Sequence, residues 1–281
     1  MGAHRMLVLS VAAACALAFV PSSGRADIQA QGSDHSVELR GSTSLYPLAQ
    51  RVAEAYMQEH PGASVVVSGE SSFRGLKAMI VGTAEVAMAT DIVPEELEKL
   101  ARTRSVKFDR FDVCRDALVP ILNPANPVSA LTLKQLSDIY RGAILNWKDV
   151  GGNDASIHVL SHEGTSGTYE TFKQTVLGDS AVITPSARML SHQGVLDLVA
   201  KDPDAIGYIG MHEVGASKVP TVNGVTADAA SITSGRYPMR RQLSLYAREP
   251  ISSETKGLID FFLDPAKGQA MVRELGDVPM K

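Results

Sequence analysis

The sequence predicts an α/β protein made of two doubly wound lobes. Short apolar runs that are typical of buried strands alternate along the chain with stretches whose apolar residues recur at helical spacing. This strand–helix alternation favours a parallel sheet with helices on both faces. The alternation falls into two series of unequal length, which fits two lobes better than one continuous sheet.

The first series runs from residue 36 to residue 102. Apolar Leu48, Val52 and Tyr56 give the helical spacing of its first helix, which ends before Pro61 and Gly62. Its last helix carries glutamates in the first turn, as the helix dipole favours. The predicted strands are 36–40, 64–67 and 86–89, and the predicted helices are 46–59, 73–81 and 94–102.

The second series begins with a strand over 116–122, which ends at a turn rich in Asn and Pro, 123–127. Periodicity alone does not show where the chain passes between the lobes. The further predicted strands are 157–160, 205–209 and 243–246, and the predicted helices are 132–140, 168–176, 193–200, 252–263 and 265–275.

The first 26 residues have the layout of a secretory signal peptide. A basic start at Arg5 is followed by an apolar run over 6–20 and by small residues at Gly24 and Ala26. The apolar run is short for a membrane span. We therefore expect cleavage before Asp27 and export to the periplasm. Cys15 follows two alanines, and lipidation there is the less favoured alternative.

The composition excludes several classes of protein. The net charge is −4, and it becomes −6 once a leader with two arginines and no acidic residue is removed. An acidic chain with 5% aromatic residues and no basic run is not typical of a nucleic-acid binder. Only Cys114 remains after cleavage, so we expect no internal disulfide and no structural zinc. We also expect no cofactor and no other metal.

Three segments share one arrangement, which is a strand, then glycine with small hydroxyl residues, then a helix. They are Gly-Ser-Thr-Ser at 41–44, Gly-Glu-Ser-Ser at 69–72 and Gly-Thr-Ser-Gly-Thr at 164–168. Such loops offer free backbone N–H groups and hydroxyls at a helix N-terminus, which bind anions without a formal positive charge. For any one loop, simple helix capping is the favoured interpretation. Three in one chain favour a shared oxyanion site in a cleft between the lobes.

The sequence matches known enzyme motifs less well than it matches an oxyanion-binding site. The nucleophile-elbow pattern G-x-S-x-G needs glycine where Thr168 stands. The sequence contains no Gly-Lys-Ser/Thr phosphate loop and no H-E-x-x-H zinc motif. His158 and His162 are four residues apart but flank a strand, which does not favour a metal site. We therefore expect a binding protein, and a phosphatase-type enzyme is the remaining enzymatic alternative.

Longer motifs surround these loops. They are Gly-Ser-Thr-Ser-Leu-Tyr-Pro-Leu-Ala at 41–49, Asn-Pro-Ala-Asn-Pro-Val at 123–128, Asn-Trp at 146–147 with Gly-Gly at 151–152, Ser-Gly-Thr at 166–168, Ile-Gly-Tyr-Ile at 206–209, Tyr-Pro-Met at 237–239 and Phe-Phe-Leu at 261–263. In this combination the chain resembles the periplasmic phosphate-binding proteins of ABC transporters, from about residue 37 to residue 280.

The resemblance implies the type II periplasmic-binding-protein architecture, in which two crossover strands join the lobes and the ligand lies between them. The crossovers would lie near 115–122 and 239–246. The first lobe would comprise residues 27–114 with 242–281, and the second lobe residues 115–241. The resemblance also implies a monomer that captures inorganic phosphate and delivers it to the permease subunits of an ABC transporter. Binding of another oxyanion, or phosphate sensing, is the alternative.

The resemblance also assigns the ligand-binding residues, which are Ser42, Thr43, Ser44, Ser72, Thr90, Asp91, His162, Ser166, Gly167 and Thr168. His162 stands where the family has a cleft arginine. The second loop reads Ser-Ser-Phe-Arg-Gly at 71–75, where the family usually has Gly-Ser-Gly-Thr-Gly. Arg74 is a candidate replacement cation, and an exposed side chain at a helix start is the equal alternative.

Two roles follow from these assignments. Hydrogen phosphate can donate its proton to Asp91 and sulfate cannot, so Asp91 is expected to discriminate between the two anions. His162 would titrate near ~6.5 and add positive charge only when protonated, which predicts pH-sensitive binding.

Overall fold

The computed structural model describes residues 36–178 and 182–280. All of these residues belong to one compact unit. The predicted signal peptide, its cleavage site and Cys15 lie outside the described residues. Within those two ranges, no helix is long and apolar enough to cross a membrane.

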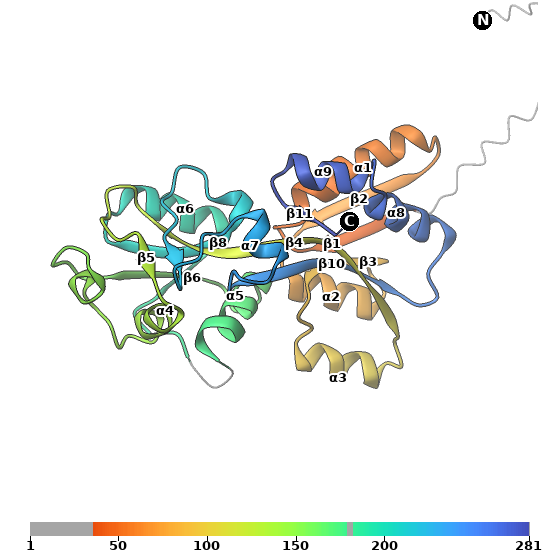
Figure 1. The fold of residues 1–281 in the computed structure, drawn as a ribbon. Helices are drawn as coiled ribbons and strands as arrows, with labels where there is room; N and C mark the ends of the chain where they lie inside the picture. The colour runs from red at the N-terminus through yellow and green to blue at the C-terminus, as the bar shows by residue number, and fades with distance from the viewer. Residues whose placement is uncertain (1–35, 179–181, 281) are drawn as a thin grey trace, which may run out of the picture. The chain divides into compact units, whose positions relative to one another are not determined.

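The first lobe is a parallel sheet covered by helices on both faces (Figure 1). Strand β1 lies between β2 and β3 and pairs with both in parallel. One apolar cluster packs α1, α8 and α9 on one face, and a second packs α2 and α3 on the other. The elements are β1 (Ser36–Gly41), α1 (Tyr46–Glu59), β2 (Ser64–Gly69), α2 (Ser72–Val81), β3 (Val86–Thr90), α3 (Glu95–Thr103), α8 (Ser253–Leu263) and α9 (Gly268–Glu274). The sequence pattern therefore predicted this doubly wound lobe correctly.

The second lobe has its own core, in which Tyr140, Phe172 and Tyr208 pack against one another. Strand β6 pairs in parallel with β7 and with β8. The predicted helix over 168–176 ends early, because the chain widens into one π turn at Lys173. The elements are β5 (Ala130–Leu131), α4 (Leu133–Tyr140), η1 (Trp147–Val150), β6 (His158–His162), α5 (Gly167–Phe172), η2 (Lys173–Leu177), β7 (Arg188–Leu190), α6 (His192–Lys201), β8 (Ala205–Gly210), η3 (Met211–Glu213), β9 (Thr221–Val222) and α7 (Ala229–Thr233).

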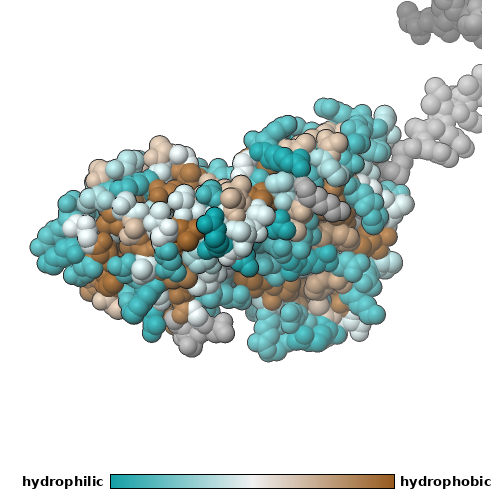
Figure 2. Space-filling view, in the orientation of Figure 1, coloured by the Kyte–Doolittle hydropathy of each residue, from teal (hydrophilic) through white to brown (hydrophobic). Residues whose placement is uncertain are grey.

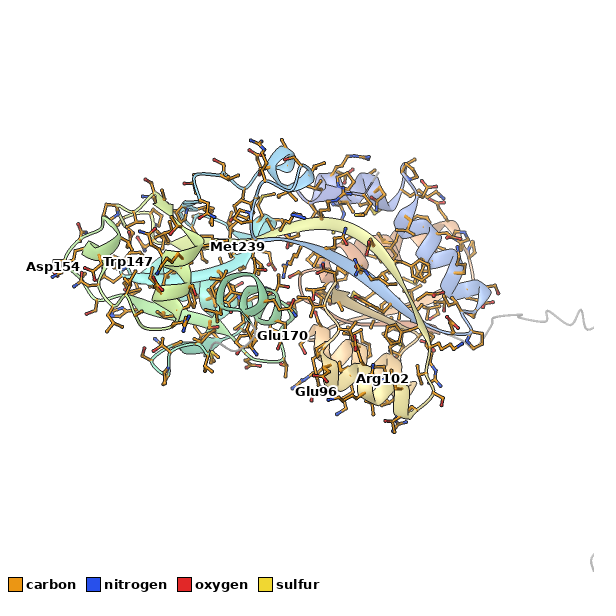
Figure 3. The ribbon with its side chains drawn as sticks, turned by 60° about the horizontal axis from the view of Figure 1, so that its bottom comes forward. Glu96, Arg102, Trp147, Asp154, Glu170 and Met239 are labelled. Atoms are coloured by element: carbon orange, nitrogen blue, oxygen red, sulfur yellow. The ribbon has the colours of Figure 1, made fainter. Side chains whose placement is uncertain are left out.

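Two long strands join the lobes. Strands β4 (Phe108–Leu122) and β10 (Arg240–Arg248) pair antiparallel and run side by side from one lobe to the other (Figure 3). β10 also pairs with β3, β4 pairs with β8, and β11 (Val278–Pro279) pairs with β4. The strand order is therefore β2-β1-β3-β10-β4-β8-β6-β7. The two crossover strands are confirmed, and the exact lobe boundaries stay a prediction.

The lobes also meet away from the crossover strands. Glu96 of α3 and Glu170 of α5 come from different lobes and line a common cavity of about 90 Å³. Both side chains lie near the junction in Figure 3. The outer face of α3 is strongly hydrophilic (Figure 2), as its acidic first turn requires. The lobes thus also meet through loops and helix ends, with both polar and apolar residues at the shared cavity.

Candidate functional site

The three glycine- and hydroxyl-rich loops line one cavity of about 350 Å³ between the lobes. The first two loops come from the first lobe, and the third comes from the second lobe. A fourth segment, which leads from β7 into α6, completes the wall. The lining residues are Ser42, Thr43, Glu70, Ser71, Ser72, His162, Glu163, Thr165, Ser166, Gly167, Thr168, Leu190, Ser191, His192 and Gln193.

The backbone of the first loop lies close to the backbone of Met88 in β3, and glycine at position 41 makes this possible. Gly41 has a φ of +136°, and an added Cβ would lie 2.2 Å from the carbonyl oxygen of Met88. The N–H of Ser42 donates to that same carbonyl oxygen at 2.8 Å. No side chain caps the following helix α1. The buried Ser42 is therefore not consumed as a helix cap.

In the other two loops, one serine caps the helix and the next hydroxyl residues do not. Ser71 caps α2 by accepting from the N–H of Arg74 at 3.3 Å, and Ser166 caps α5 by accepting from the N–H of Thr168 at 3.2 Å. Ser72 and Thr168 follow in the first turns and are buried, at 4% and 3% exposure. The capping interpretation is correct for Ser71 and Ser166, whereas Ser72 and Thr168 line the cavity without capping a helix.

At Gly167 the two lobes lie close together. An added Cβ would lie 2.3 Å from the hydroxyl oxygen of Ser72 and 2.9 Å from the methyl carbon of Thr90. A side chain at this position would therefore push the lobes apart. The hydroxyl of Thr90 is buried and has no hydrogen-bond partner among the described residues. A buried hydroxyl without a partner carries a free-energy cost that a bound ligand can remove.

Arg241 is a residue beside the candidate site that the sequence analysis did not single out. Its guanidinium is buried behind the cavity, where Nη1 donates to the Thr168 hydroxyl at 2.8 Å and Nη2 donates to the Ser44 hydroxyl at 3.1 Å. Because these hydroxyl oxygens accept from a cation, their own hydrogens remain available to donate. Arg241 thus links one anion loop of each lobe. The only sequence signal was its position next to the Tyr-Pro-Met motif at 237–239.

A buried carboxylate balances the charge of Arg241. The guanidinium contacts Asp116 Oδ2 from Nη2 at 2.6 Å and from Nε at 2.8 Å. Nearby, His212 forms an ion pair with Asp277 at 3.0 Å. Asp116, His212 and Asp277 offer ligand atoms within 4.8 Å of one another, the spacing of a metal site. The carboxylates are already paired with cations of the protein, so this hinge cluster (Asp116, His212, Asp277 and Arg241) is a charge network.

The pKa of His162 lies well below the value of ~6.5 that we expected from the sequence. Burial, with the nearby His192 as a second cause, lowers the pKa of His162 to about 3. The ring is 1% exposed, and its Nε2 lies 2.8 Å from the carbonyl oxygen of Tyr208. Since a carbonyl oxygen can only accept, Nε2 carries the hydrogen. Sequence reasoning went wrong because the depth of β6 in the lobe cannot be read from its residues.

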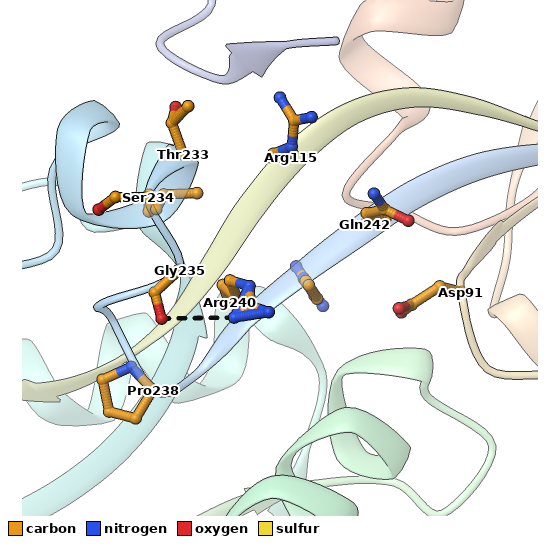
Figure 4. Close-up of a pocket in the computed structure, with 10 residues that line it drawn as sticks. Asp91, Arg115, Thr233, Ser234, Gly235, Pro238, Arg240 and Gln242 are labelled. Carbon is orange, nitrogen blue, oxygen red and sulfur yellow. Dashed lines mark hydrogen bonds between the residues drawn. The ribbon is translucent and has the colours of Figure 1, made fainter.

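Asp91 and Arg74 lie away from this cavity. Asp91 lines a second cavity of about 540 Å³ beside the crossover strands, together with Arg115, Arg240 and Gln242 (Figure 4). Arg74 is exposed and lines neither cavity. The structure therefore brings together seven of the predicted residues, puts Ser44 and Thr90 just behind them, and separates Asp91. The seven are Ser42, Thr43, Ser72, His162, Ser166, Gly167 and Thr168.

The 350 Å³ cavity has the chemistry of a reversible oxyanion site. Its lining includes no lysine or arginine side chain, and hydroxyl groups supply most of its donors. Two glutamates, Glu70 and Glu163, also line it, and Glu70 is paired with Arg40 at 3.0 Å. Donors at the ends of two helices can hold an anion by hydrogen bonds alone.

Comparison with known proteins gives a consistent result. A family model described as a PBP superfamily domain matches residues 26–266. The chain is 27% identical over 277 residues to a phosphate-binding protein PstS of Bacillus subtilis, an alignment that covers 97% of this chain and 90% of the relative.

Solved structures agree with this match. A putative phosphate ABC transporter substrate-binding protein from Clostridium perfringens, determined with bound phosphate, is 31% identical with a TM-score of 0.81. That comparison covers 88% of this chain and 100% of the other. An ABC-type phosphate transport receptor from Vibrio cholerae is 28% identical with a TM-score of 0.73, over 86% of this chain and 99% of the other.

Proposed function

Because this chain belongs to the PBP superfamily, we propose that it is an extracytoplasmic solute-binding protein that captures inorganic phosphate and delivers it to an ABC-type permease. One observation carries the proposal. Three hydroxyl-rich loops, two from one lobe and one from the other, line a single cavity. The relatives with the same architecture are named as phosphate-binding proteins and not as enzymes.

The two lobes would close around the bound anion. We propose that residues 27–114 with 242–281 form the first lobe and residues 115–241 the second, hinged at β4 and β10. Closure around the anion would create the surface that permease subunits recognise. We further propose that the protein works as a monomer in the periplasm after removal of its leader.

Calorimetry with phosphate tests this function on the purified protein. We expect saturable binding, and at ~100 times the dissociation constant phosphate should stabilise the fold by about 2.7 kcal/mol. Ser72→Ala should weaken phosphate binding by roughly tenfold to 100-fold, because a hydrogen bond to a charged group contributes about 1.5–3 kcal/mol.

Ser253→Ala is the matched control. Ser253 is also the first residue of a helix capped by the serine before it, but it is exposed and lies at neither cavity. Its loss should leave phosphate affinity unchanged. Stabilisation by another oxyanion with no response to phosphate would replace the proposal with the alternative ligand. Turnover of a chromogenic phosphomonoester would establish an enzyme instead.

A further inference from the structure

His162 lines the cavity and has a buried ring nitrogen without a hydrogen-bond partner among the described residues. Its Nε2–H is committed to the carbonyl oxygen of Tyr208 at 2.8 Å. In the neutral ring, the other nitrogen then carries a lone pair and no hydrogen. That nitrogen, Nδ1, is buried and has no hydrogen-bond partner among the described residues. The residue itself lines the cavity four positions before Ser166.

The neighbours of His162 keep the ring neutral. His192 lies with its ring centroid 4.5 Å away, and its Nδ1 contacts Glu213 at 3.2 Å. Tyr208 packs edge-on against the other side, and Arg241 lies within electrostatic range. Burial, His192 and Arg241 all lower the pKa of His162, and the raising effects of the Tyr208 carbonyl and of Glu213 are smaller in sum, so the pKa falls to about 3. The ring therefore stays an acceptor across the neutral pH range.

A hydrogen-bond acceptor in this position would distinguish oxyanions that carry an O–H group from those that carry none. Phosphate and arsenate keep at least one O–H at neutral pH, whereas sulfate and selenate keep none. An O–H group satisfies the Nδ1 lone pair. A bare oxygen placed against the same lone pair leaves two acceptors facing each other without a hydrogen.

We propose that His162 Nδ1 accepts the hydroxyl of the bound oxyanion and so makes the site selective for ligands that carry a proton. This inference rests on the proposed function and sharpens it, because it reassigns the discriminating role from Asp91, which lies at the other cavity. The ligand class is a protonated tetrahedral oxyanion, and His162 is its specificity-determining residue.

Four anions measured at pH 8 test the inference directly. At this pH phosphate and sulfate are both mainly dianions, as are arsenate and selenate, so each pair differs by a proton and hardly in charge or shape. We expect the native protein to bind phosphate and arsenate roughly 100-fold or more tightly than sulfate and selenate.

Two substitutions of His162 test whether selectivity depends on the acceptor nitrogen Nδ1. His162→Asn and His162→Phe both remove the ring N–H that bonds the Tyr208 carbonyl, but only Asn keeps an acceptor near the position of Nδ1. We expect His162→Phe to reduce the phosphate-to-sulfate ratio by roughly tenfold or more, and His162→Asn to retain most of it. Selectivity is a ratio of affinities, so a smaller folded fraction cancels from it. His158→Asn, an exposed histidine on the same strand paired with Asp202, should leave the ratio unchanged.

The outcomes separate the two proposals. A native protein that binds none of the four anions overturns the proposed function. A native protein that binds phosphate selectively, with the ratio unchanged in His162→Phe, overturns the role of His162 and leaves phosphate capture standing. An equal loss of selectivity in His162→Asn and His162→Phe also contradicts the acceptor role, because it would trace selectivity to the bond with Tyr208.

Discussion

The cavity that Asp91 lines and the cavity that the three loops line differ in the kind of donor they offer. The larger one, about 540 Å³, is lined by Arg115, Arg240 and Arg241, and the smaller one, about 350 Å³, is lined mainly by serines and threonines. Of these arginines only Arg240 is exposed, and water and salt screen the attraction of an exposed charge for anions. Hydroxyls and N–H groups fixed at helix ends have a defined geometry and can be enclosed. An anion site is therefore better recognised by oriented donors than by the number of positive charges.

Arg241 connects the two cavities, and its surroundings explain why it is not simply a binding cation. Its charge is neutralised by Asp116, and its remaining N–H groups reach Ser44 and Thr168. Of these two residues, Thr168 lines the smaller cavity, and Ser44 follows the lining residues Ser42 and Thr43 in the sequence. Exposed Arg240, its neighbour in the sequence, contacts the carbonyl oxygen of Gly235 at 3.4 Å. Adjacent strand residues point to opposite faces, which explains the difference between the two arginines.

The largest expected effect comes from removing Arg241. Arg241→Met should destabilise the protein by about 3–5 kcal/mol, because the buried carboxylate of Asp116 would lose the guanidinium that contacts its Oδ2. Urea unfolding measures this loss. Arg240→Ala is the matched control and should change stability by less than about 0.5 kcal/mol, since its side chain is exposed. Equal effects of the two substitutions would contradict the asymmetry between them.

A smaller effect should appear in the pH dependence of stability. Burial alone would lower the pKa of His212, but Asp277, helped by Asp116 and Glu213, outweighs it and raises the pKa to about 9. In the unfolded chain the pKa is about 6.5. The charged histidine therefore contributes its full stability below pH ~6.5, and this contribution is lost as pH rises to about 9.

The size of this loss follows from the shift in pKa. Between pH 6.5 and 9.5 the native protein should lose roughly 2–3 kcal/mol that His212→Gln does not lose over the same range. The comparison uses the change of the free energy of unfolding with pH in each protein. Absolute stabilities are not compared, because His212→Gln also leaves Asp277 without its partner and therefore starts from a lower stability. Parallel pH profiles for the two proteins would show that His212 is not charged in the folded state.

The fold was largely predictable because it depends on patterns that lie along the chain. The predicted helix 46–59 matches α1, and the first lobe shows the expected helices on both faces of its sheet. The predicted strand 116–122 covers only the second half of β4, because charged residues in 108–115 hide the first half. The three loops were also predictable, since each repeats glycine and hydroxyl residues between a strand and a helix.

The chemistry of the site was less predictable because it depends on burial. Two adjacent arginines, Arg240 and Arg241, look equivalent in the sequence, yet only Arg241 is buried against a carboxylate. His162 was expected to titrate near ~6.5, whereas its burial in the second lobe lowers its pKa to about 3. Asp91 follows the buried strand β3, but its side chain lies at the other cavity. Each of these differences depends on which neighbours the tertiary fold supplies.

A crystal structure of the protein grown with phosphate tests the central claim most directly. We predict that phosphate lies in the smaller cavity, with its oxygens about 2.7–3.2 Å from donors of Ser42, Ser72 and Thr168. No lysine or arginine side chain should contact it there. Phosphate bound instead in the larger cavity, against Arg115 and Arg240, would contradict the account, because it would show that exposed positive charge, and not the hydroxyl loops, selects the anion.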